Sequence, residues 1–218
     1  MGIQERDMKN IICFICLFII WEVSAYAGYS ESYSKLSSED KIIVDKIDRY
    51  FVELKTLKGS FIQSNNFDGT MAEGIFYVHR PEKLRFEYTN PFKSILITNG
   101  KATTFYDVEL DEISTLPTSA TPLSFLLKYG QGLRELGFTI TSVNVDNSVI
   151  TVKTESKNNG KSYMLNFTFD RKTNKLKGLD LDNDEQSLSL EFINLEENIN
   201  LDKNLFIFKN PRLYRRRK

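Results

Sequence analysis

The sequence predicts a mainly β protein whose antiparallel strands follow one another along the chain and curl into a barrel-like sheet. Short stretches in which apolar and polar residues alternate, such as residues 74–79 and 84–88, recur through most of the chain. Glycine, proline or asparagine separates each stretch from the next, and Asn99-Gly100 is a typical two-residue hairpin turn. A meander with one apolar face tends to curl, because curling hides that face and the strand edges together.

The composition bounds the class of protein. A length of 218 residues fits one large or two small domains, and the formal net charge of zero gives no support to nucleic-acid binding. Aromatic residues make up 12% of the chain, enough to line a sizeable core or cavity. We expect a monomer with no nucleic-acid partner.

The N-terminus carries the features of a secretory signal peptide. An apolar run over residues 11–21 is too short to span a bilayer as a helix, which needs about 20 residues. Lys9 precedes this run, and Ala25-Tyr26-Ala27 follows it as an A-x-A cleavage pattern. We therefore predict a signal peptide over residues 1–27 and an exported mature chain; the alternative is an uncleaved membrane anchor. Both cysteines lie in the predicted signal peptide, so the mature chain has no disulfides.

A flexible polar lead, residues 28–37, is predicted to precede one amphipathic helix. Ser38 is the expected N-cap, and the helix should run to about Thr56. Its apolar residues have helical spacing: Ile43, Ile47, Tyr50, Phe51 and Leu54. This apolar face either packs on a sheet or covers the mouth of a cavity, and the spacing does not separate the two.

Eleven strands are expected after this helix, within one domain over residues 38–211. They are 59–66, 72–79, 83–89, 94–99, 102–107, 110–114, 137–145, 148–155, 161–170, 174–183 and 186–195. A further terminal strand is expected at residues 206–208, followed by a basic tail over residues 212–218.

The meander is interrupted between Ser119 and Gly137. Thr121-Pro122 begins a short helix over residues 121–128, with Thr as the cap and Pro at the first helical position. This helix is apolar almost all round, through Leu123, Phe125, Leu126 and Leu127. It must therefore be buried against the sheet or plug an opening.

The sequence does not contain a recognisable catalytic constellation. His79 is the single histidine, and it has no matched nucleophile, so a structural role is favoured. The acidic group Asp180, Asp182, Asp184 and Glu185 lacks the spacing of an EF-hand, which favours a solvated turn over a calcium site. We expect no enzyme activity, no metal and no cofactor.

Together these segments resemble the LolA family of periplasmic outer-membrane lipoprotein carriers. The resemblance covers residues 40 to 211 through the order and spacing of several short motifs. They are residues 59–63, Gly74, Arg80-Pro81, residues 84–88, Pro91, residues 95–100, Phe105-Tyr106, Thr121-Pro122, residues 206–208 and Pro211. It implies an incomplete (unclosed) antiparallel β-barrel of about eleven strands, with an N-terminal helix and a short helical lid over an apolar cavity.

The resemblance also implies a function and a set of partners. Such a carrier binds the acyl chains of lipoproteins in the periplasm, without a cofactor. It takes them from an inner-membrane lipoprotein-releasing ABC transporter and passes them to an outer-membrane lipoprotein receptor. The residues implied to bind acyl chains or the lid are Arg80, Leu84, Phe86, Phe76, Phe61, Leu123, Phe125, Leu126 and Leu127. One departure is Phe86, where the family usually has Trp, and another is the ending over residues 213–218.

Arg80 is the residue that the resemblance assigns to holding the lid closed. Strand alternation places it in line with Phe76 and Val78, on the apolar face. We expect its acceptors to be backbone carbonyls at the end of the 121–128 helix. Two alternatives to a lipoprotein carrier remain open: a half-barrel that binds another lipid or glycolipid, and an envelope-stress sensor or scaffold module.

Overall fold

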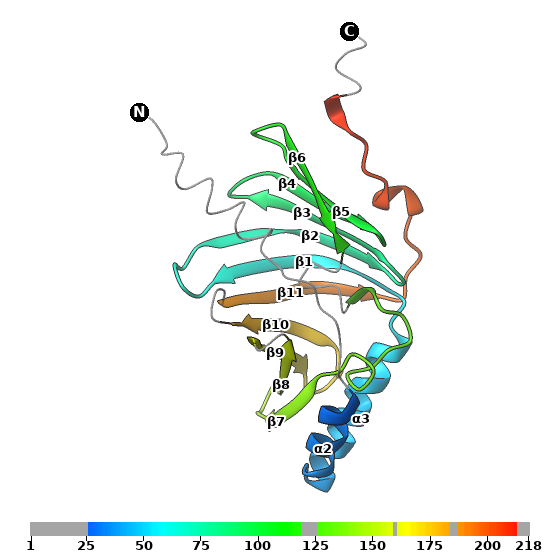
Figure 1. The fold of residues 1–218 in the computed structure, drawn as a ribbon, viewed down its shortest axis with the longest axis vertical. Coiled ribbons are helices and arrows are strands. Elements are labelled where there is room, and N and C mark those ends of the chain that lie inside the picture. The colour runs from blue at the N-terminus through cyan, green and yellow to red at the C-terminus, as the bar shows by residue number, and fades with distance from the viewer. Residues whose placement is uncertain (1–25, 119–125, 159–160, 184–186, 213–218) are drawn as a thin grey trace.

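The computed structural model describes residues 26–118, 126–158, 161–183 and 187–212. Eleven strands form one antiparallel sheet (Figure 1). They are β1 (Thr56–Asn65), β2 (Met71–His79), β3 (Lys83–Asn90), β4 (Ser94–Asn99), β5 (Ala102–Asp107), β6 (Glu112–Pro117), β7 (Thr139–Val145), β8 (Val149–Asn158), β9 (Lys161–Asp170), β10 (Leu176–Asp182) and β11 (Ser187–Glu197).

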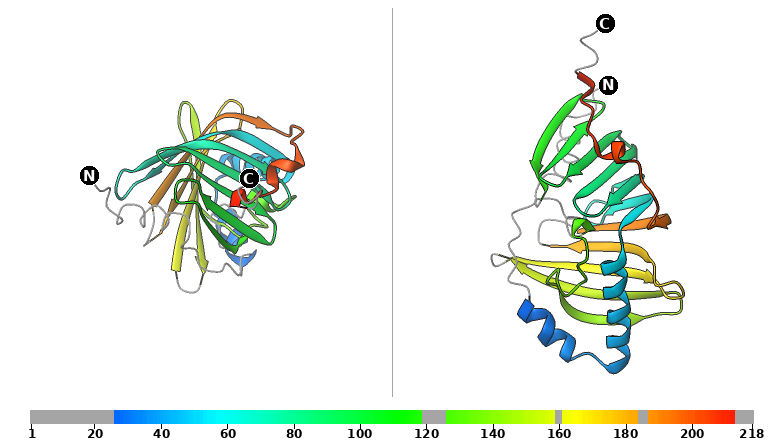
Figure 2. Two further views of the ribbon diagram at one scale, coloured as in Figure 1. Left: turned by 90° about the horizontal axis from the view of Figure 1, so that it is seen from above. Right: turned by 90° about the vertical axis from the view of Figure 1, so that its right-hand side faces the viewer.

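The sheet is curved, as the strand pattern predicts, and unclosed, as the family resemblance implies (Figure 2). Its order is β6-β5-β4-β3-β2-β1-β11-β10-β9-β8-β7, so β6 and β7 lie at its two ends. The long-range pairing of β1 with β11 joins the two halves of the meander, with Phe61 opposite Phe192. Figure 2 shows the strands wrapping around one inner face.

Helix α3 (Ser38–Glu53) packs on the inner face of the β7–β10 half of the sheet (Figures 1 and 2). The ring of Phe51 lies 5.4 Å from that of Phe167 and 6.0 Å from that of Phe169, both on β9. The helix therefore packs on the sheet, one of the two roles that the sequence left open. Its N-cap is Ser37, whose side chain accepts a hydrogen bond from the Asp40 amide, and the prediction of Ser38 was wrong by one residue.

The N-terminal lead differs from its prediction. A second helix, α2 (Tyr26–Ser34), occupies most of the stretch that we expected to be flexible. Tyr29 is buried and stacks on Tyr33 at 5.7 Å, while Ser32 Oγ accepts a hydrogen bond from the Ile140 amide at 3.1 Å. Helix α2 thus covers backbone at the β7 edge. No described helix combines the length and the hydropathy needed to cross a membrane.

The terminal strand predicted at residues 206–208 was also wrong. The chain instead forms a 3-10 helix, η3 (Lys203–Phe206), and then runs without regular structure over the outer face of β3 to β5. Arg85 Nη1 donates a hydrogen bond to the Leu205 carbonyl at 3.0 Å, and Tyr106 packs on Phe208 at 5.9 Å. The segment is thus packed against the sheet although it forms no strand. The predicted basic tail lies outside the described residues beyond Arg212.

Candidate functional site

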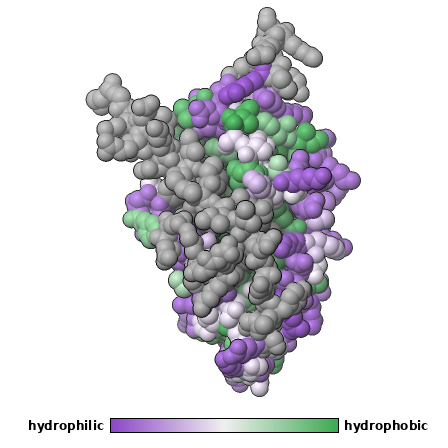
Figure 3. Space-filling view, viewed as in Figure 1, coloured by the Kyte–Doolittle hydropathy of each residue, from purple (hydrophilic) through white to green (hydrophobic). Residues whose placement is uncertain are grey.

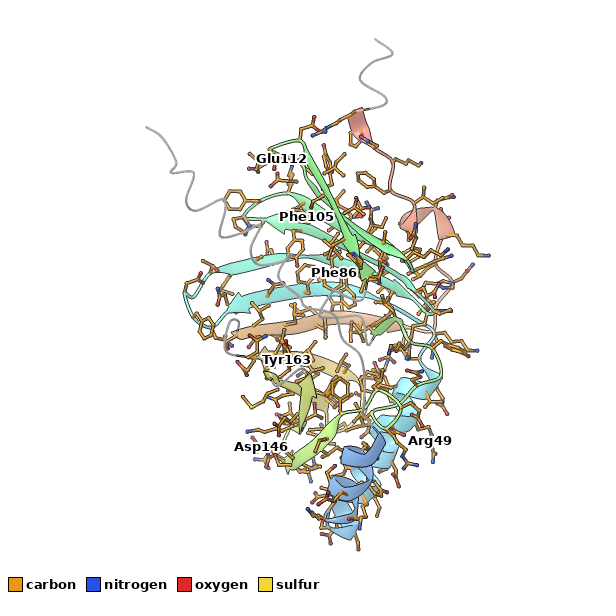
Figure 4. The ribbon with its side chains drawn as sticks, in the orientation of Figure 1. Arg49, Phe86, Phe105, Glu112, Asp146 and Tyr163 are labelled. Carbon is orange, nitrogen blue, oxygen red and sulfur yellow. The ribbon has the colours of Figure 1, made fainter. Side chains whose placement is uncertain are left out.

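An aromatic cluster lies on the inner face at the middle of the sheet. Phe61 on β1, Phe76 on β2 and Phe86 on β3 are each at most 2% exposed. The Phe86 ring lies 4.9 Å from that of Phe61 and stacks on that of Phe76 at 5.2 Å. Figure 4 labels Phe86 over the central strands. The structure therefore brings together three of the residues that the sequence analysis named.

Two further aromatic residues complete this cluster. Phe192 on β11 packs against Phe76 at 5.1 Å, and Tyr88 on β3 packs edge-on against Phe61 at 5.1 Å. The Tyr88 hydroxyl donates to Gln63 Oε1 at 3.0 Å, and burial raises the pKa of Tyr88. We refer to Phe61, Phe76, Phe86, Tyr88 and Phe192 as the inner aromatic cluster. Phe192 was not among the predicted site residues, because its place depends on the long-range register of β1 with β11.

Gly74 makes room for this cluster. A Cβ atom built there would lie 2.0 Å from the Glu87 carbonyl oxygen and 2.9 Å from the Phe61 ring. Phe61 is paired directly with Gly74, so its ring occupies the space that a side chain would take. Only glycine permits this close approach of β2, β3 and the aromatic ring.

The inner apolar face continues from the cluster toward β6. Phe86, Leu96 and Phe105 face the same side on β3, β4 and β5, since they are paired across the ladders. Figure 3 shows apolar side chains gathered on the upper part of this face, over β3 to β6, and Figure 4 labels Phe105 there.

Leu84 lies where this face meets the segment that follows β6. It is buried between Val78 on β2 and Thr98 on β4. The hydroxyl of Thr98 bonds that of Thr118 at 2.8 Å, which ties the chain just after β6 to the inner face. This threonine contact was not predictable from the sequence, because neither residue carries a distinctive local signal.

Arg80 follows β2 and is only 4% exposed. Its Nη1 atom donates to the carbonyl oxygens of Phe51 and of Leu54, the latter at 3.0 Å, and Nη2 donates to the Gln131 carbonyl at 3.4 Å. Two acceptors therefore belong to the C-terminal end of α3, where carbonyls lack helical partners and favour a cation. Among the described residues none belongs to the end of the 121–128 helix, so the predicted acceptors were wrong.

The guanidinium of Arg80 is buried and incompletely satisfied. Burial lowers the pKa of Arg80 to about 10, which still leaves it charged near neutral pH. In the part of the chain that the structure describes, Arg80 Nε and the nearby Gln131 Oε1 have no hydrogen-bond partner. A buried polar atom without a partner costs about 1–3 kcal/mol. The contact between Arg80 and Gln131 therefore leaves buried polar atoms of both side chains without a hydrogen bond among the described residues.

The segment between β6 and β7, residues 118–138, is named here the lid segment. Leu126 and Leu127 are buried in the same core as the inner aromatic cluster, and the Leu127 carbonyl accepts a hydrogen bond from the Glu82 amide at 3.0 Å. Leu123 and Phe125 lie outside the described residues. The described end of the lid segment is therefore attached to the β2–β3 turn and lies beside α3 (Figure 1).

The titratable side chains do not gather into a metal site within the described ranges. No group of three or more His, Cys, Asp or Glu residues there could hold an ion. The ring of His79 packs on Phe206 at 6.1 Å, against the C-terminal segment and away from the inner aromatic cluster. The apolar, aromatic inner face is suited to holding hydrocarbon.

Comparison with known proteins finds relatives that are described as outer-membrane lipoprotein carrier proteins. The outer-membrane lipoprotein carrier protein of Coxiella burnetii is 30% identical over 195 residues, which cover 83% of this chain and 89% of that protein. The protein of the same name from Methylococcus capsulatus is 32% identical over 143 residues, 63% of this chain and 67% of that protein. Among solved structures, the Pseudomonas aeruginosa MucA/MucB complex matches with a TM-score of 0.45 and 12% identity, covering 79% of this chain and 62% of that chain.

A family model described as outer membrane lipoprotein carrier protein LolA matches residues 52–209. The matched range runs from the end of α3 to the C-terminal segment, and so includes all eleven strands and the lid segment. The chain therefore belongs to the LolA family of outer-membrane lipoprotein carrier proteins.

Proposed function

We propose that this protein is a periplasmic carrier that binds the acyl chains of lipoproteins between its inner face and its lid segment. The observation that carries the proposal is the inner aromatic cluster, which shares one buried core with Leu126 and Leu127 in a chain of the LolA family. The names of the two relatives described above support the same role. In this role the protein binds and releases its cargo without catalysis.

The energetics of an acyl chain define what such a carrier must supply. Each buried methylene contributes about 0.8 kcal/mol, so a chain of about fifteen is held out of water by roughly 12 kcal/mol. The carrier must offer comparable apolar surface and yet release it without fuel of its own. This requires two states of similar free energy, one filled by the protein's own side chains and one filled by cargo.

The structure supports a self-filled closed state. Leu126 and Leu127 of the lid segment are buried in one core with the inner aromatic cluster. In the proposed open state the lid segment moves away, and acyl chains take the place of these leucines in the core. One set of apolar groups then replaces another, so the two states differ little in buried apolar area.

Arg80 is proposed to set the balance between these two states. Its hydrogen bonds join the end of α3 to the lid segment at Gln131, and its Nε atom lacks a partner among the described residues. Charged donors contribute about 1.5–3 kcal/mol per hydrogen bond, whereas the unpaired Nε has the opposite effect. The closed state is thus held, but weakly enough for cargo to compete.

The proposed route runs from the inner to the outer membrane. An inner-membrane lipoprotein-releasing ABC transporter is the donor, and an outer-membrane lipoprotein receptor is the acceptor. Each partner must favour a different state of the carrier: the donor the open state, and the acceptor the closed state that expels the cargo.

Mass spectrometry of material that co-purifies with the protein from periplasm tests this function. An acylated protein, bound in a ratio near one to one, is the expected result. Purification of a free lipid or glycolipid alone would contradict the lipoprotein role and favour a different apolar ligand. A stable protein partner without acyl groups would instead favour a sensor or scaffold.

A further inference from the structure

Asp48 lies at a second contact between α3 and the lid segment. Its Oδ1 atom accepts a hydrogen bond from the Arg134 backbone amide at 3.4 Å, and the Leu133 amide also stabilises the carboxylate. The Leu133 side chain is fully buried and Leu136 is 4% exposed. The turn over residues 131–136 thus contains two buried leucines, and it is joined to α3 where Asp48 accepts hydrogen bonds from its backbone amides.

Gly132 permits this contact. A Cβ atom at this position would lie 2.3 Å from Asp48 Oδ1 and 2.5 Å from its carboxyl carbon. Real Cβ atoms do not approach that closely, so a larger residue would separate the turn from the carboxylate, by moving either the backbone or the Asp48 side chain. The Gly132 amide also donates to Glu135 Oε2 at 2.9 Å, which holds the turn in shape.

Arg80 and Asp48 both form hydrogen bonds with the backbone of the turn, three residues apart, at Gln131 and Arg134. Arg80 donates to the carbonyl of Gln131, and Asp48 accepts from the amide of Arg134. The two side chains are of opposite charge and use opposite backbone groups. We propose that Asp48 is a positioning residue of the lid segment, which fixes the turn over residues 131–136 against α3 and so favours the closed state. This inference rests on the proposed carrier function.

The surroundings of Asp48 offer backbone donors to its oxygen atoms but disfavour a negative charge on the carboxyl group. Burial raises the pKa of Asp48, and the nearby Glu135 raises it further, while the amides of Arg134 and Leu133 and the Arg134 charge oppose this. The Arg134 guanidinium itself lies 5.3 Å from the ring of Tyr29 and 5.8 Å from that of Tyr33, both on α2. A neutral side chain with the same oxygen should therefore replace Asp48 without loosening the turn.

Three variants separate this role from a general effect of the substitution. Asp48→Ala removes the acceptor, Asp48→Asn keeps it without the charge, and Glu53→Ala removes an exposed acid from the same helix. Amide hydrogen exchange of residues 133–136 is measured in the cargo-free protein. We expect exchange about tenfold faster in Asp48→Ala, as the loss of one such hydrogen bond predicts, and within about twofold of the parent in the other two variants.

Equal exchange in Asp48→Ala and the parent would overturn the inference, and so would faster exchange in Asp48→Asn to the same extent as in Asp48→Ala. If Asp48→Ala does not fold, Gly132→Ala tests the same contact from the side of the turn. It should accelerate exchange of the same amides, and a protected turn in that variant would contradict the proposed contact.

Loading of a triacylated lipopeptide is then measured with the same variants. Asp48→Ala should load faster and release to acceptor vesicles more slowly, whereas Asp48→Asn should behave as the parent does. If exchange changes as expected but neither the parent nor any variant loads lipopeptide, the carrier function fails while the contact stands. If all load and release alike despite the change in exchange, Asp48 does not position the lid for transfer.

Discussion

The Nη1 atom of Arg80 lies 3.0 Å from the carbonyl oxygen of Leu54, the residue that caps α3 at its C-terminus. This contact places a buried cation at the negative end of the helix dipole. Because the same guanidinium reaches the Gln131 carbonyl, α3, the β2–β3 turn and the lid segment meet at one side chain. Any movement of the lid segment away from α3 must break or rearrange the hydrogen bonds of Arg80.

Arg80→Leu should shift the protein toward its open state. Loss of about 1–2 kcal/mol corresponds to a fivefold to thirtyfold change in population, roughly the contribution of one such hydrogen bond. We expect the variant to load lipoprotein but to pass it on poorly, so that a loaded complex accumulates in a reconstituted transfer assay. Arg85→Leu, which alters an arginine on the outer face, is the control. Normal onward transfer by Arg80→Leu would show that Arg80 has only a structural role.

Leu84→Glu tests whether the inner face acts as a binding surface. If acyl chains occupy the space beside Leu84, the added carboxylate should abolish loading while the protein remains folded, because the charge can reach water in the open state. Ile113→Glu, on the outer face of β6, should load as the parent does. The measurements are lipopeptide binding and the thermal melt. In a permanently closed core the glutamate would be a buried charge, so loss of the cooperative melt together with binding would contradict the binding surface.

The strands and α3 were predictable because their signals are local. Alternation within residues 84–88 and helical spacing from Ile43 to Leu54 depend only on neighbours in the chain. The acceptors of Arg80 were not predictable in this way, since Phe51 and Leu54 reach Arg80 only after α3 has folded onto the sheet. The strand predicted at residues 206–208 was wrong for a related reason. Phe206 and Phe208 are two residues apart, as on one face of a strand, but their rings pack against His79 and Tyr106, which are distant in the sequence.

The pH dependence of stability should differ between the parent and Asp48→Asn. Burial raises the pKa of Asp48 above its ordinary value of 3.8, so the native carboxyl takes up a proton at a higher pH than the unfolded chain does. The resulting contribution is greatest below the ordinary pKa and is lost as the pH rises through the native one. The parent should therefore gain stability relative to Asp48→Asn as the pH falls from about 7 to about 4. Denaturant midpoints at both pH values measure this, and a constant difference between the two proteins would refute it.

The mature chain is predicted to begin at Gly28. The pattern Ala25-Tyr26-Ala27 places cleavage just before it, within the first turn of α2. Translation is predicted to begin at Met8, because Glu5 and Asp7 are unusual at the start of a signal peptide. Peptide mapping of the precursor and the exported form checks both statements. Residues 1–7 in the precursor would refute the start at Met8, and a mature N-terminus other than Gly28 would refute the cleavage site.

The central claim is that acyl chains lie against the inner aromatic cluster, and photo-crosslinking tests it most directly. A triacylated lipopeptide with a photoreactive group at the end of one acyl chain is loaded, irradiated and mapped by mass spectrometry. We predict crosslinks to the inner-face residues Phe61, Phe76 and Phe86, and their loss in Leu84→Glu. Crosslinks confined to outer-face residues such as Ile75 and Tyr77 would contradict the account.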